Sequence, residues 1–437
     1  MIKKFFLFYL IFGVLLSCKN IDESDNENAK EISASKNNVL LIITDDMGLD
    51  ASIGYNIGNQ KPKMPNVQSL INSGLKFNNV WANPVCSPTR STILTGKYGY
   101  RTSVLTVDDI VSTSETSLFK YIKENSNYNS ALIGKWHLSG KPPDQNHPNN
   151  MGVDYYAGII GGGIQNYYNW SFSKNGKSSI STEYSTTKLT NEAINWINDQ
   201  ENSWFLWLAY NAPHTPFHLP PKDLHSQGEL PSDAASIDSN PLPYYLAMIE
   251  SIDSEIGRLF NEIDENILNN TTIIFIGDNG TPNQVAQQYN PRRTKGTLYK
   301  GGINVPMIIS GNQVARKNQD ENALINTTDL YTTISELCGI TNLEMFDSKS
   351  FKSLLNNSSN SNMREYIYSE IGSENFTIRN STHKYIFFNN GEEALFNLSL
   401  NQFENPNLLS ANQLPLNEVD QSNKMALLNK LKEIRGN

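Results

Sequence analysis

Short runs dominated by hydrophobic residues occur at intervals along the first three quarters of the chain. The clearest cover residues 39–43, 130–133, 204–210 and 272–276. A run that stays apolar instead of alternating is typical of a strand buried on both faces of a sheet. Segments with helical spacing of apolar residues lie between these runs, at 64–74, 118–125, 187–199 and 244–268. This succession predicts an α/β fold in which a large, mixed but mostly parallel sheet is sandwiched by helices.

The last quarter of the chain has a different pattern. After a polar stretch rich in Asn and Ser at 343–363, short runs alternate between apolar and polar residues at 366–368, 376–378 and 384–388. Alternation with a period of two predicts a small antiparallel sheet. A closing helix is expected at 425–434. We therefore expect a main domain at 37–355 and a smaller C-terminal α+β subdomain, with an antiparallel sheet, at 356–437.

Residues 139–184 show no long periodicity and are rich in Pro, Asn, Gly and Tyr. We expect a long loop there, of the kind that often carries specificity on an α/β scaffold. Its aromatic rings, such as Tyr167, Tyr168 and Trp170, could stack on sugars or could pack the loop against itself. The sequence leaves both interpretations open.

The first 36 residues precede this pattern. Two lysines at positions 3 and 4 are followed by an apolar stretch, short for a membrane span, that ends in Leu15-Leu16-Ser17-Cys18. The arrangement resembles a bacterial lipobox, which implies a signal peptide at 1–17 and a lipid on Cys18. Residues 18–36 are acidic and predict a flexible tether. The expected location is the outer membrane of a Gram-negative bacterium, on its periplasmic side or at the cell surface. An uncleaved N-terminal anchor is the alternative.

Composition narrows the classes of function. The chain has 437 residues, 38% hydrophobic content and a net charge of −9, so it can bury a sizeable core but shows no basic stripe for nucleic acid. An anionic substrate would need a local cluster of cations. The only cysteines are Cys18, Cys86 and Cys338, which excludes a disulfide framework and a Cys-rich zinc module. Cys338 is expected to be a small buried apolar residue.

Polar residues follow two of the hydrophobic runs. Asp45 and Asp46 end the first run, and Asp278 and Asn279 end the run at 272–276. Ligands gather at the carboxyl ends of parallel strands, so we expect the two pairs to meet there. Adjacent carboxylates repel unless they are solvated or bind a cation, and oxygen ligands select calcium, with magnesium second. A solvated turn capped by aspartates is the alternative.

Two further positions carry candidate chemistry. Cys86 opens a predicted helix, whose N-terminus offers free N–H groups, and Arg90 lies one turn on along the same face. Lys135 and His137 follow a hydrophobic run two residues apart, so in an extended chain they point to the same side. A cation beside an imidazole suits proton transfer to a charged substrate. A Lys and a His merely exposed at a strand end are the alternative.

Five motifs together resemble the type I, formylglycine-dependent sulfatases of the alkaline-phosphatase-like superfamily. They are Cys86-Ser87-Pro88-Thr89-Arg90 with Leu94-Thr95-Gly96, Gly134-Lys135-Trp136-His137-Leu138, Asn211-Ala212-Pro213-His214-Thr215-Pro216-Phe217, Gly277-Asp278-Asn279-Gly280 and the stretch that begins at Lys295 and ends at Pro306. Lys300 and Asn304 depart from the Glu and Arg usual in the last motif, which leaves local packing and substrate preference open. The resemblance runs from about Asn37 to the C-terminus.

The resemblance implies a function and a site. Cys86 would be oxidised to formylglycine (3-oxoalanine) by a formylglycine-generating or sulfatase-maturating enzyme, and the protein would hydrolyse sulfate esters of a sulfated carbohydrate. A hydroxyl of the hydrated residue attacks sulfur, with Asp278 as candidate base; His214 or Lys295 protonates the leaving alcohol, and His137 takes a proton from the second hydroxyl. The implied catalytic residues are Cys86, Arg90, Lys135, His137, His214 and Lys295, and the implied ligands of Ca²⁺ or Mg²⁺ are Asp45, Asp46, Cys86, Asp278 and Asn279.

Two other functions stay open. A phosphodiesterase or phosphonate monoester hydrolase of the same superfamily could share the nucleophile. Two-zinc phosphatases of that superfamily usually carry His among their metal ligands, so Asn279 favours the sulfatase branch. A non-catalytic glycan-binding lipoprotein would keep Cys86 unmodified and would bind without turnover.

Overall fold

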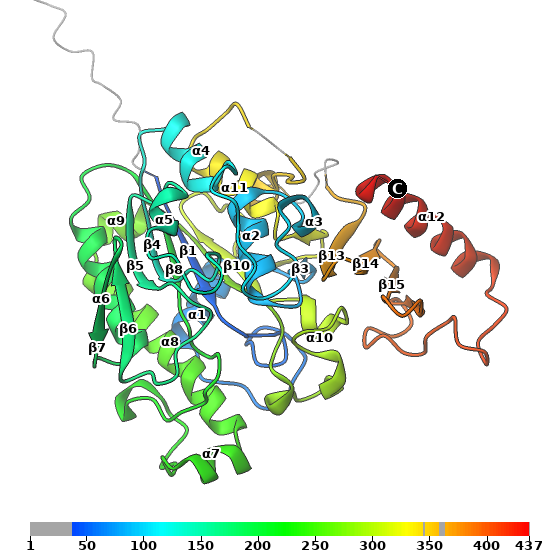
Figure 1. Ribbon diagram of the computed structural model, residues 1–437, viewed down its shortest axis with the longest axis horizontal. Coiled ribbons are helices and arrows are strands. Elements are labelled where there is room, and N and C mark those ends of the chain that lie inside the picture. Colours follow the sequence, from blue (N-terminus) through cyan, green and yellow to red (C-terminus); the bar gives the residue numbers. More distant parts are fainter. Residues whose placement is uncertain (1–36, 344–345, 358–362, 437) are drawn as a thin grey trace, which may run out of the picture. The chain divides into compact units, whose positions relative to one another are not determined.

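A ten-stranded sheet forms the centre of the computed structural model, which describes residues 37–343, 346–357 and 363–436 (Figure 1). The order of strands is β11-β2-β10-β9-β1-β8-β4-β5-β6-β7. Their bounds are β1 (Asn38–Thr44), β2 (Gly74–Phe77), β4 (Asn129–Lys135), β5 (Tyr155–Ile159), β6 (Trp170–Lys174), β7 (Lys177–Ser181), β8 (Trp204–Ala209), β9 (Thr271–Gly277), β10 (Met307–Gly311) and β11 (Gln319–Glu321). Neighbours from β9 to β5 run parallel, whereas β10 and β6 are antiparallel to the strands beside them. The predicted mixed, mostly parallel sheet is confirmed.

Helices cover both faces of this sheet. Alternate side chains of β1 point to opposite faces, and each face has its own hydrophobic cluster. On the face of Leu41, the cluster includes residues of α2 (Cys86–Thr95), α4 (Leu118–Asn125) and α11 (Asp329–Leu337). On the face of Leu40, it includes residues of α1 (Pro65–Ser73), α6 (Ser185–Asn198) and α8 (Leu242–Glu262). Because both faces of β1 are buried against hydrophobic residues, the polar residues associated with this strand that can form a site are those that follow its carboxyl end.

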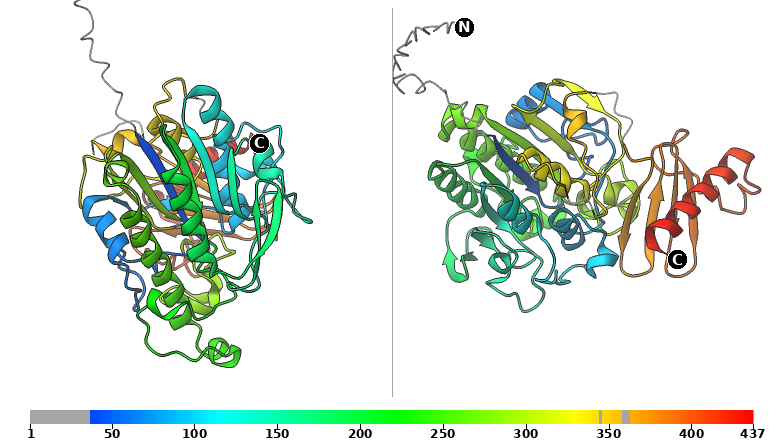
Figure 2. Two further views of the ribbon diagram at one scale, coloured as in Figure 1. Left: turned by 90° about the vertical axis from the view of Figure 1, so that its left-hand side faces the viewer. Right: turned by 90° about the horizontal axis from the view of Figure 1, so that it is seen from above.

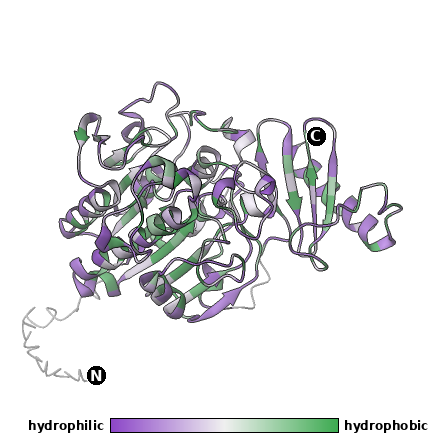
Figure 3. Ribbon diagram, turned by 90° about the horizontal axis from the view of Figure 1, so that it is seen from below, coloured by the Kyte–Doolittle hydropathy of each residue, from purple (hydrophilic) through white to green (hydrophobic). Residues whose placement is uncertain are grey.

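A separate four-stranded antiparallel sheet follows, as predicted (Figure 2). It consists of β13 (Ile367–Ile371), β14 (Asn375–Arg379), β15 (His383–Phe387) and β16 (Glu393–Asn397), and the last helix is α12 (Glu418–Arg435). Leu427 and Leu431 of α12 share a cluster with Tyr385 and Leu395 of the sheet. Strands of both sheets carry much of the hydrophobic colour in Figure 3.

The other face of the small sheet packs against the main body of the chain. Ile386 and Phe396 share a cluster with Leu298, which lies just before α10 (Lys300–Ile303). The C-terminal sheet therefore supports the segment that contains Lys295. The predicted boundary between residues 355 and 356 stays a prediction.

Several shorter elements connect these parts. They are α3 (Gly99–Thr102), α5 (His147–Asn150), α7 (Ala234–Ser239), α9 (Glu265–Asn269), the two-stranded sheet of β3 (Val80–Trp81) and β12 (Ile325–Asn326), and the 3-10 turns Lys222–Leu224, Asn283–Val285, Pro291–Arg293 and Lys352–Leu355. Within the described residues, no helix has the length and apolar character needed to cross a membrane. The predicted signal peptide, tether and lipid site at Cys18 lie outside the described residues.

The expected loop at 139–184 is wrong in part, because β5, β6 and β7 lie within it and extend the main sheet. Strand β7 is exposed along most of its length and has almost no hydrophobic residues, so no periodicity marks it. The aromatic residues Tyr167 and Trp170 are buried in the core. Their packing favours the interpretation in which these rings hold the segment together.

Other boundaries also differ from the predictions. The helix expected at 244–268 ends at Glu262, where Ile263 turns to extended backbone and Asp264 caps the separate helix α9. The closing helix begins earlier than expected, because the side chain of Asn417 accepts a hydrogen bond from the backbone N–H of Asp420 and caps α12.

Candidate active site

The carboxyl ends of neighbouring parallel strands bring the predicted acidic residues together. Thr44 of β1 pairs with Gly277 of β9, so Asp45 and Asp46 emerge beside Asp278 and Asn279. The backbone N–H of Asp46 donates to Asp278 Oδ1 at 3.0 Å, and the Asn279 amide donates to Asp46 Oδ1 at 2.8 Å. All four side chains are buried. Asp46 has a φ of 69°, a backbone conformation that is uncommon for residues other than glycine and that concentrates at functional sites.

Each of the three carboxylates contacts its own cation. Lys135 Nζ donates to Asp45, and Lys295 Nζ donates to Asp46. Arg90 donates twice to Asp278 Oδ2, from Nη2 at 2.7 Å and from Nε at 3.1 Å. These contacts join the ends of β1, β4 and β9 with α2 in one network.

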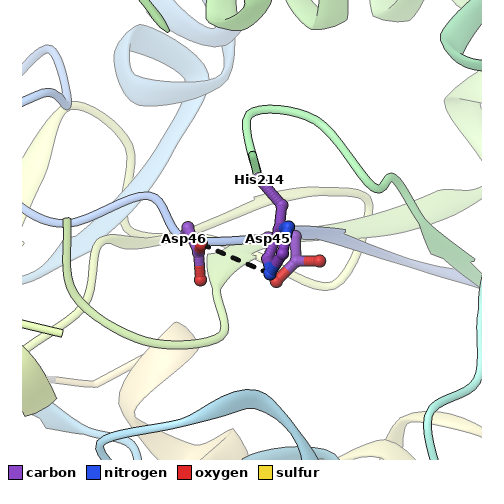
Figure 4. A group of neighbouring side chains, drawn as sticks. All are labelled: Asp45, Asp46 and His214. Carbon is purple, nitrogen blue, oxygen red and sulfur yellow. Dashed lines mark ion pairs between the residues drawn. The ribbon is translucent and has the colours of Figure 1, made fainter. Parts of the chain in front are cut away.

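His214 approaches the same network from the loop after β8. Its Nε2 atom lies 3.7 Å from Asp46 Oδ2, and Figure 4 shows the imidazole beside Asp45 and Asp46. Its Nδ1 atom lies 2.7 Å from the carbonyl oxygen of Thr215. The ring is therefore held with Nε2 toward the carboxylates.

Cys86 begins a second chain of contacts. It is the first residue of α2, and its Sγ lies 3.3 Å from His137 Nδ1. His137 Nε2 in turn lies 3.1 Å from Asp108 Oδ1, and Asp108 Oδ2 lies 2.6 Å from Lys141 Nζ. Both His137 and Asp108 have positive φ angles, 59° and 63°. The imidazole thus connects the Cys86 side chain to a carboxylate that fixes its orientation.

A glycine loop covers both imidazoles. A Cβ atom on Gly162 would lie 2.3 Å from His137 Nε2, and one on Gly163 would lie 3.5 Å from His214 Cε1. Gly162 can therefore carry no side chain without displacing the ring. The loop lines a cavity of about 630 Å³ that also contains Cys86, His137, His214 and Lys295.

Burial sets the protonation states around Cys86. Burial raises the pKa of the Cys86 thiol to about 11, with Lys135 opposing and Asp45 adding to the rise, so the unmodified side chain is a neutral thiol at pH 7. Burial, with help from Lys135, lowers the pKa of His137 to about 3 although Asp108 opposes the change. The imidazole is therefore neutral at pH 7 and free to accept a proton.

The carboxylates respond differently to the same burial. For Asp45, burial alone would raise the pKa, but Lys135 and the other nearby cations hold it well below its usual range. Burial and the charge of Asp45 raise the pKa of Asp278 to about 6 despite Arg90. Asp278 thus has a stronger tendency than Asp45 to bind a proton when no further cation is present.

The donor set fits a hard divalent cation. Asp45 Oδ1 and Asn279 Oδ1 are buried and have no hydrogen-bond partner among the described residues. Ligand atoms of Asp45, Cys86 and Asp278 lie within 4.8 Å of one another, as do those of Asp45, Asp46 and His214. Carboxylate and amide oxygens with free lone pairs are the ligands that Ca²⁺ and Mg²⁺ prefer. These residues therefore have the chemistry to hold such an ion.

The structure brings every residue of the predicted site together and leaves some neighbouring candidates outside it. His218, just after the His214 motif, is half-buried, with its ring centroid 4.1 Å from that of Tyr167. Asn304 is buried and accepts a hydrogen bond from the backbone N–H of Val80, so it has a packing role. Asp108 and Gly162 were not predicted as site residues. A Gly-Gly-Gly run and one Asp in a loop give little signal until the fold places them against His137.

Comparison with known proteins supplies a family. Residues 37–340 match the family model described as Sulfatase. The chain is 26% identical over 378 residues to "Uncharacterized sulfatase YdeN" of Escherichia coli K12, an alignment that covers 74% of this chain and 66% of that protein. It is 27% identical over 350 residues to "Ulvan-active sulfatase" of Formosa agariphila, with 76% and 66% coverage. The alignments thus span just under two thirds of these two relatives.

Solved structures agree with this match. The crystal structure of Ps i-CgsB superposes with a TM-score of 0.77 and 27% identity, over 92% of both chains. The same protein in complex with k-i-k-neocarrahexaose gives a TM-score of 0.76. The fold described above therefore occurs in a solved protein of similar extent.

Proposed function

Since the chain belongs to the sulfatase family, we propose that it is a sulfuric ester hydrolase that removes sulfate from a sulfated carbohydrate through a formylglycine at position 86 and a divalent metal ion. One observation carries the proposal. Cys86 is buried beside a neutral imidazole and next to the network of three carboxylates and three cations, and it lines a cavity together with His214 and Lys295. A sulfate group needs this combination of positive charge around its oxygens and a nucleophile beside its sulfur.

The proposed substrate class rests on relatives. One of them is named as active on ulvan, and another was crystallised with a neocarrahexaose. We therefore favour a fragment of a sulfated polysaccharide.

Two groups would supply chemistry that the twenty amino acids lack. A formylglycine at position 86, once hydrated, would provide a hydroxyl nucleophile, and a Ca²⁺ or Mg²⁺ held by Asp45, Asp46, Asp278 and Asn279 would draw negative charge from the sulfate oxygens. The neutral, buried thiol of Cys86 is a weak nucleophile, which favours a modified side chain at this position.

His137 is the base we assign to residue 86. Its Nδ1 atom lies 3.3 Å from Sγ, which stands in for an oxygen atom on Cβ of the modified side chain. The neutral ring can take a proton there, while Asp108 holds the N–H on the other ring nitrogen. Asp108 is thus a positioning residue that acts through His137.

Lys295 and His214 face the part of the cavity open to the leaving group. Lys295 is about a quarter exposed and His214 about a fifth, whereas Lys135 is fully buried on Asp45. We assign the protonation of the leaving oxygen to His214 or Lys295. Lys135 and Arg90 keep the carboxylates in place, because Arg90 also donates to the carbonyl oxygen of Lys135 at 3.0 Å.

The test compares a sulfate ester and a phosphate ester of 4-nitrophenol on protein produced together with a sulfatase-maturating enzyme. We expect the sulfate ester to be the better substrate by kcat/KM, and defined sulfated oligosaccharides to release sulfate. A preference for the phosphate ester, together with two zinc ions per chain, would replace this proposal by the phosphodiesterase alternative. Sugar binding without any turnover by protein that carries formylglycine would support the glycan-binding alternative.

Attachment to the outer membrane through lipid on Cys18 is a further proposal, motivated by the lysines, apolar stretch and lipobox of the first 18 residues. The Cys18→Ala variant should leave the membrane fraction or accumulate as the uncleaved precursor. Correctly cleaved Cys18→Ala protein that still sediments with outer membranes would contradict it.

A further inference from the structure

A second cavity, of about 640 Å³, lies between the main body and the C-terminal sheet. None of its lining residues lines the cavity beside Cys86. Three cations line it: Lys76 from β2, Lys300 from α10 and Arg379 from β14. Much of the remaining lining consists of amide side chains, among them Asn79 and Gln402. We call this the amide pocket.

The cations of the amide pocket are poorly neutralised. Arg379 is 8% exposed, and its guanidinium donates to Asn79 Oδ1 and to the carbonyl oxygens of Asn380 and Ser381. Lys300 Nζ donates to Gln402 Oε1 at 3.2 Å. Among the described residues, no carboxylate oxygen lies within 4.0 Å of the charged nitrogens of either side chain. Of the three cations, Lys76 has an acidic partner, the half-exposed Asp320, at 3.1 Å.

The buried carboxylate beside these cations, Glu404, already has hydrogen-bond partners of its own. Glu404 accepts from the ammonium group of Lys384, a fully buried residue, and from the backbone N–H of Lys300 at 2.8 Å. In the described part of the chain, Lys76 pairs with Asp320 and Lys384 pairs with Glu404, whereas neither Lys300 nor Arg379 has an ion-pair partner. This local excess of positive charge occurs in a chain whose net charge is −9.

A buried or half-buried cation without a counter-charge is unfavourable, because it loses hydration without gaining an ion pair. Burial lowers the pKa of Lys300 to about 8 and that of Arg379 to about 10, as expected when Glu404 compensates them only in part. An oxyanion in the cavity would supply the missing charge. The amides around it offer both donors and acceptors, which suits the hydroxyl groups of a sugar.

We propose that the amide pocket binds a sugar residue through its sulfate or carboxylate group, at a site separate from the one at which sulfate is cleaved. Lys300 and Arg379 would contact the oxyanion, and Asn79 and Gln402 would contact hydroxyl groups. Lys300 stands where the resembled motif has Glu, so this chain has a cation where an acid would repel such a ligand. The inference concerns binding alone and does not depend on catalysis at position 86.

Isothermal titration calorimetry on the full-length Cys86→Ala variant tests the proposal without turnover. The probes are a sulfated carrageenan hexasaccharide, the same hexasaccharide after chemical desulfation, a trigalacturonate and sodium sulfate. We expect the sulfated or the carboxylated oligosaccharide to bind, and whichever binds identifies the group. We expect part of the affinity to be retained in a Lys295→Ala background. In that background, either Lys300→Gln or Arg379→Gln should lower the affinity at least tenfold, and the decrease should be larger at low salt.

Controls separate this site from the Cys86 cavity and from misfolding. Lys317→Gln removes an exposed lysine elsewhere and should change no affinity. Lys300→Glu restores the acid of the resembled motif and should abolish the same binding event while the melting temperature stays close to that of the parent. The proposal is overturned if the oligosaccharides bind equally well to the Lys300 and Arg379 variants, or if sodium sulfate binds and neither anionic oligosaccharide does.

Discussion

Two buried groups of charged residues in this chain differ in their balance of charge. In the strand-end cluster, Asp45, Asp46 and Asp278 each contact a cation, namely Lys135, Lys295 and Arg90. In the C-terminal cluster, Lys384, Lys300 and Arg379 lie around the single carboxylate of Glu404. The first is balanced in charge but leaves carboxylate and amide oxygens without partners, whereas the second has an excess of cations.

The difference indicates what each cluster can still bind. The strand-end cluster has balanced charges but oxygens without hydrogen-bond partners, so it suits a metal cation that these oxygens can coordinate. The C-terminal cluster has its hydrogen bonds satisfied but an excess of positive charge, so it suits an anion. Burial alone would not distinguish the two, because both clusters are largely inaccessible to solvent. The following predictions test this contrast, beginning with the largest expected effect.

Loss of the Cys86 side chain should abolish catalysis and leave the strand-end cluster otherwise intact. The Cys86→Ala variant should lose about 10⁴-fold or more in kcat, as expected when a nucleophile is removed, with little change in melting temperature. Hydrolysis of 4-nitrophenyl sulfate measures the loss, and peptide mass spectrometry should find formylglycine at position 86 of the active parent. Cys338→Ala, at the other buried cysteine among the described residues, is the matched control and should retain turnover. An active preparation with an unmodified thiol at position 86 would contradict the mechanism.

Neutralising Glu404 should destabilise the fold, because it leaves the ammonium group of Lys384 buried without a counter-charge. The Glu404→Gln variant should lose about 3–5 kcal/mol in the free energy of unfolding, measured by urea denaturation. Glu393→Gln, which breaks the exposed pair with Lys424, should lose less than about 1 kcal/mol. The double variant Glu404→Gln/Lys384→Met should recover most of the loss. Equal stability of the two single variants would show that the C-terminal cluster is not as tightly buried as described.

Removing metal should make the stability of the strand-end cluster depend on pH. The pKa of Asp278 is raised from 3.8 to about 6, so its contribution to the free energy of unfolding is present below pH 3.8 and is lost as the pH rises through 6. The loss should be about 3 kcal/mol in chelated protein and should be reversed by calcium at pH 7. Urea denaturation at pH 4 and pH 7 measures it.

The matched variant for that experiment is Asp278→Asn, which cannot titrate at this position. The difference between parent and variant isolates Asp278 from other titrating groups. This difference in the free energy of unfolding should depend on pH in chelated protein and should no longer depend on pH when calcium is present. A calcium-dependent rise in melting temperature that is as large in Asp278→Ala as in the parent would contradict the assigned ligand set.

Loss of the contacts that position His137 should change kcat more than it changes KM. Asp108→Asn removes the charge that holds the imidazole, and kcat should fall about 10- to 100-fold while KM changes little. Asp108→Glu should recover part of the rate. Lys141→Gln removes the exposed partner of Asp108 and serves as control, since the carboxylate still contacts His137. A rise in KM with an unchanged kcat would instead assign Asp108 to substrate binding.

The smallest expected effect is a pH dependence in the C-terminal cluster. Because the pKa of Lys300 is lowered from 10.5 to about 8, the unfolded chain binds more protons between these values, and stability should rise with pH across that window. Solvent screening should keep the rise below about 2 kcal/mol. Thermal denaturation from pH 8 to pH 10 of parent and Lys300→Met measures it. A bound anionic sugar should flatten the parent curve, and a parent curve identical to that of Lys300→Met would contradict the charge excess.

The sequence predicted the strand-end cluster well because its residues follow strands that are hydrophobic throughout. Asp45 and Asp278 are 233 positions apart, yet both come directly after such a strand, and parallel pairing brings strand ends together. Arg90 could be placed from helical spacing alone. The motifs then identified the family, which the match over residues 37–340 confirms.

Features that depend on packing between distant segments were not predictable in this way. Asp108 reaches His137 from a loop with no periodic pattern, and Lys300 meets Arg379 only after the C-terminal sheet has packed against Leu298. The strands β6 and β7 escaped detection because they are short and, in β7, nearly devoid of apolar residues. Each of these features depends on tertiary contacts between distant segments, and the local sequence has no pattern that would predict them.

Every residue of α2 is buried, with Cys86 only 2% exposed at its beginning. An enzyme that oxidises this cysteine must therefore reach it before the sheet and its covering helices close around it. The strands that enclose the site pair across more than two hundred residues, and such non-local topologies fold slowly. If position 86 is modified as proposed, modification and folding are competing processes, and the yield of modified protein would depend on how long the newly made chain stays unfolded. Slower synthesis or a bound chaperone would lengthen that interval, whereas a stabilised, fast-folding variant would shorten it and leave more chains with an unmodified thiol.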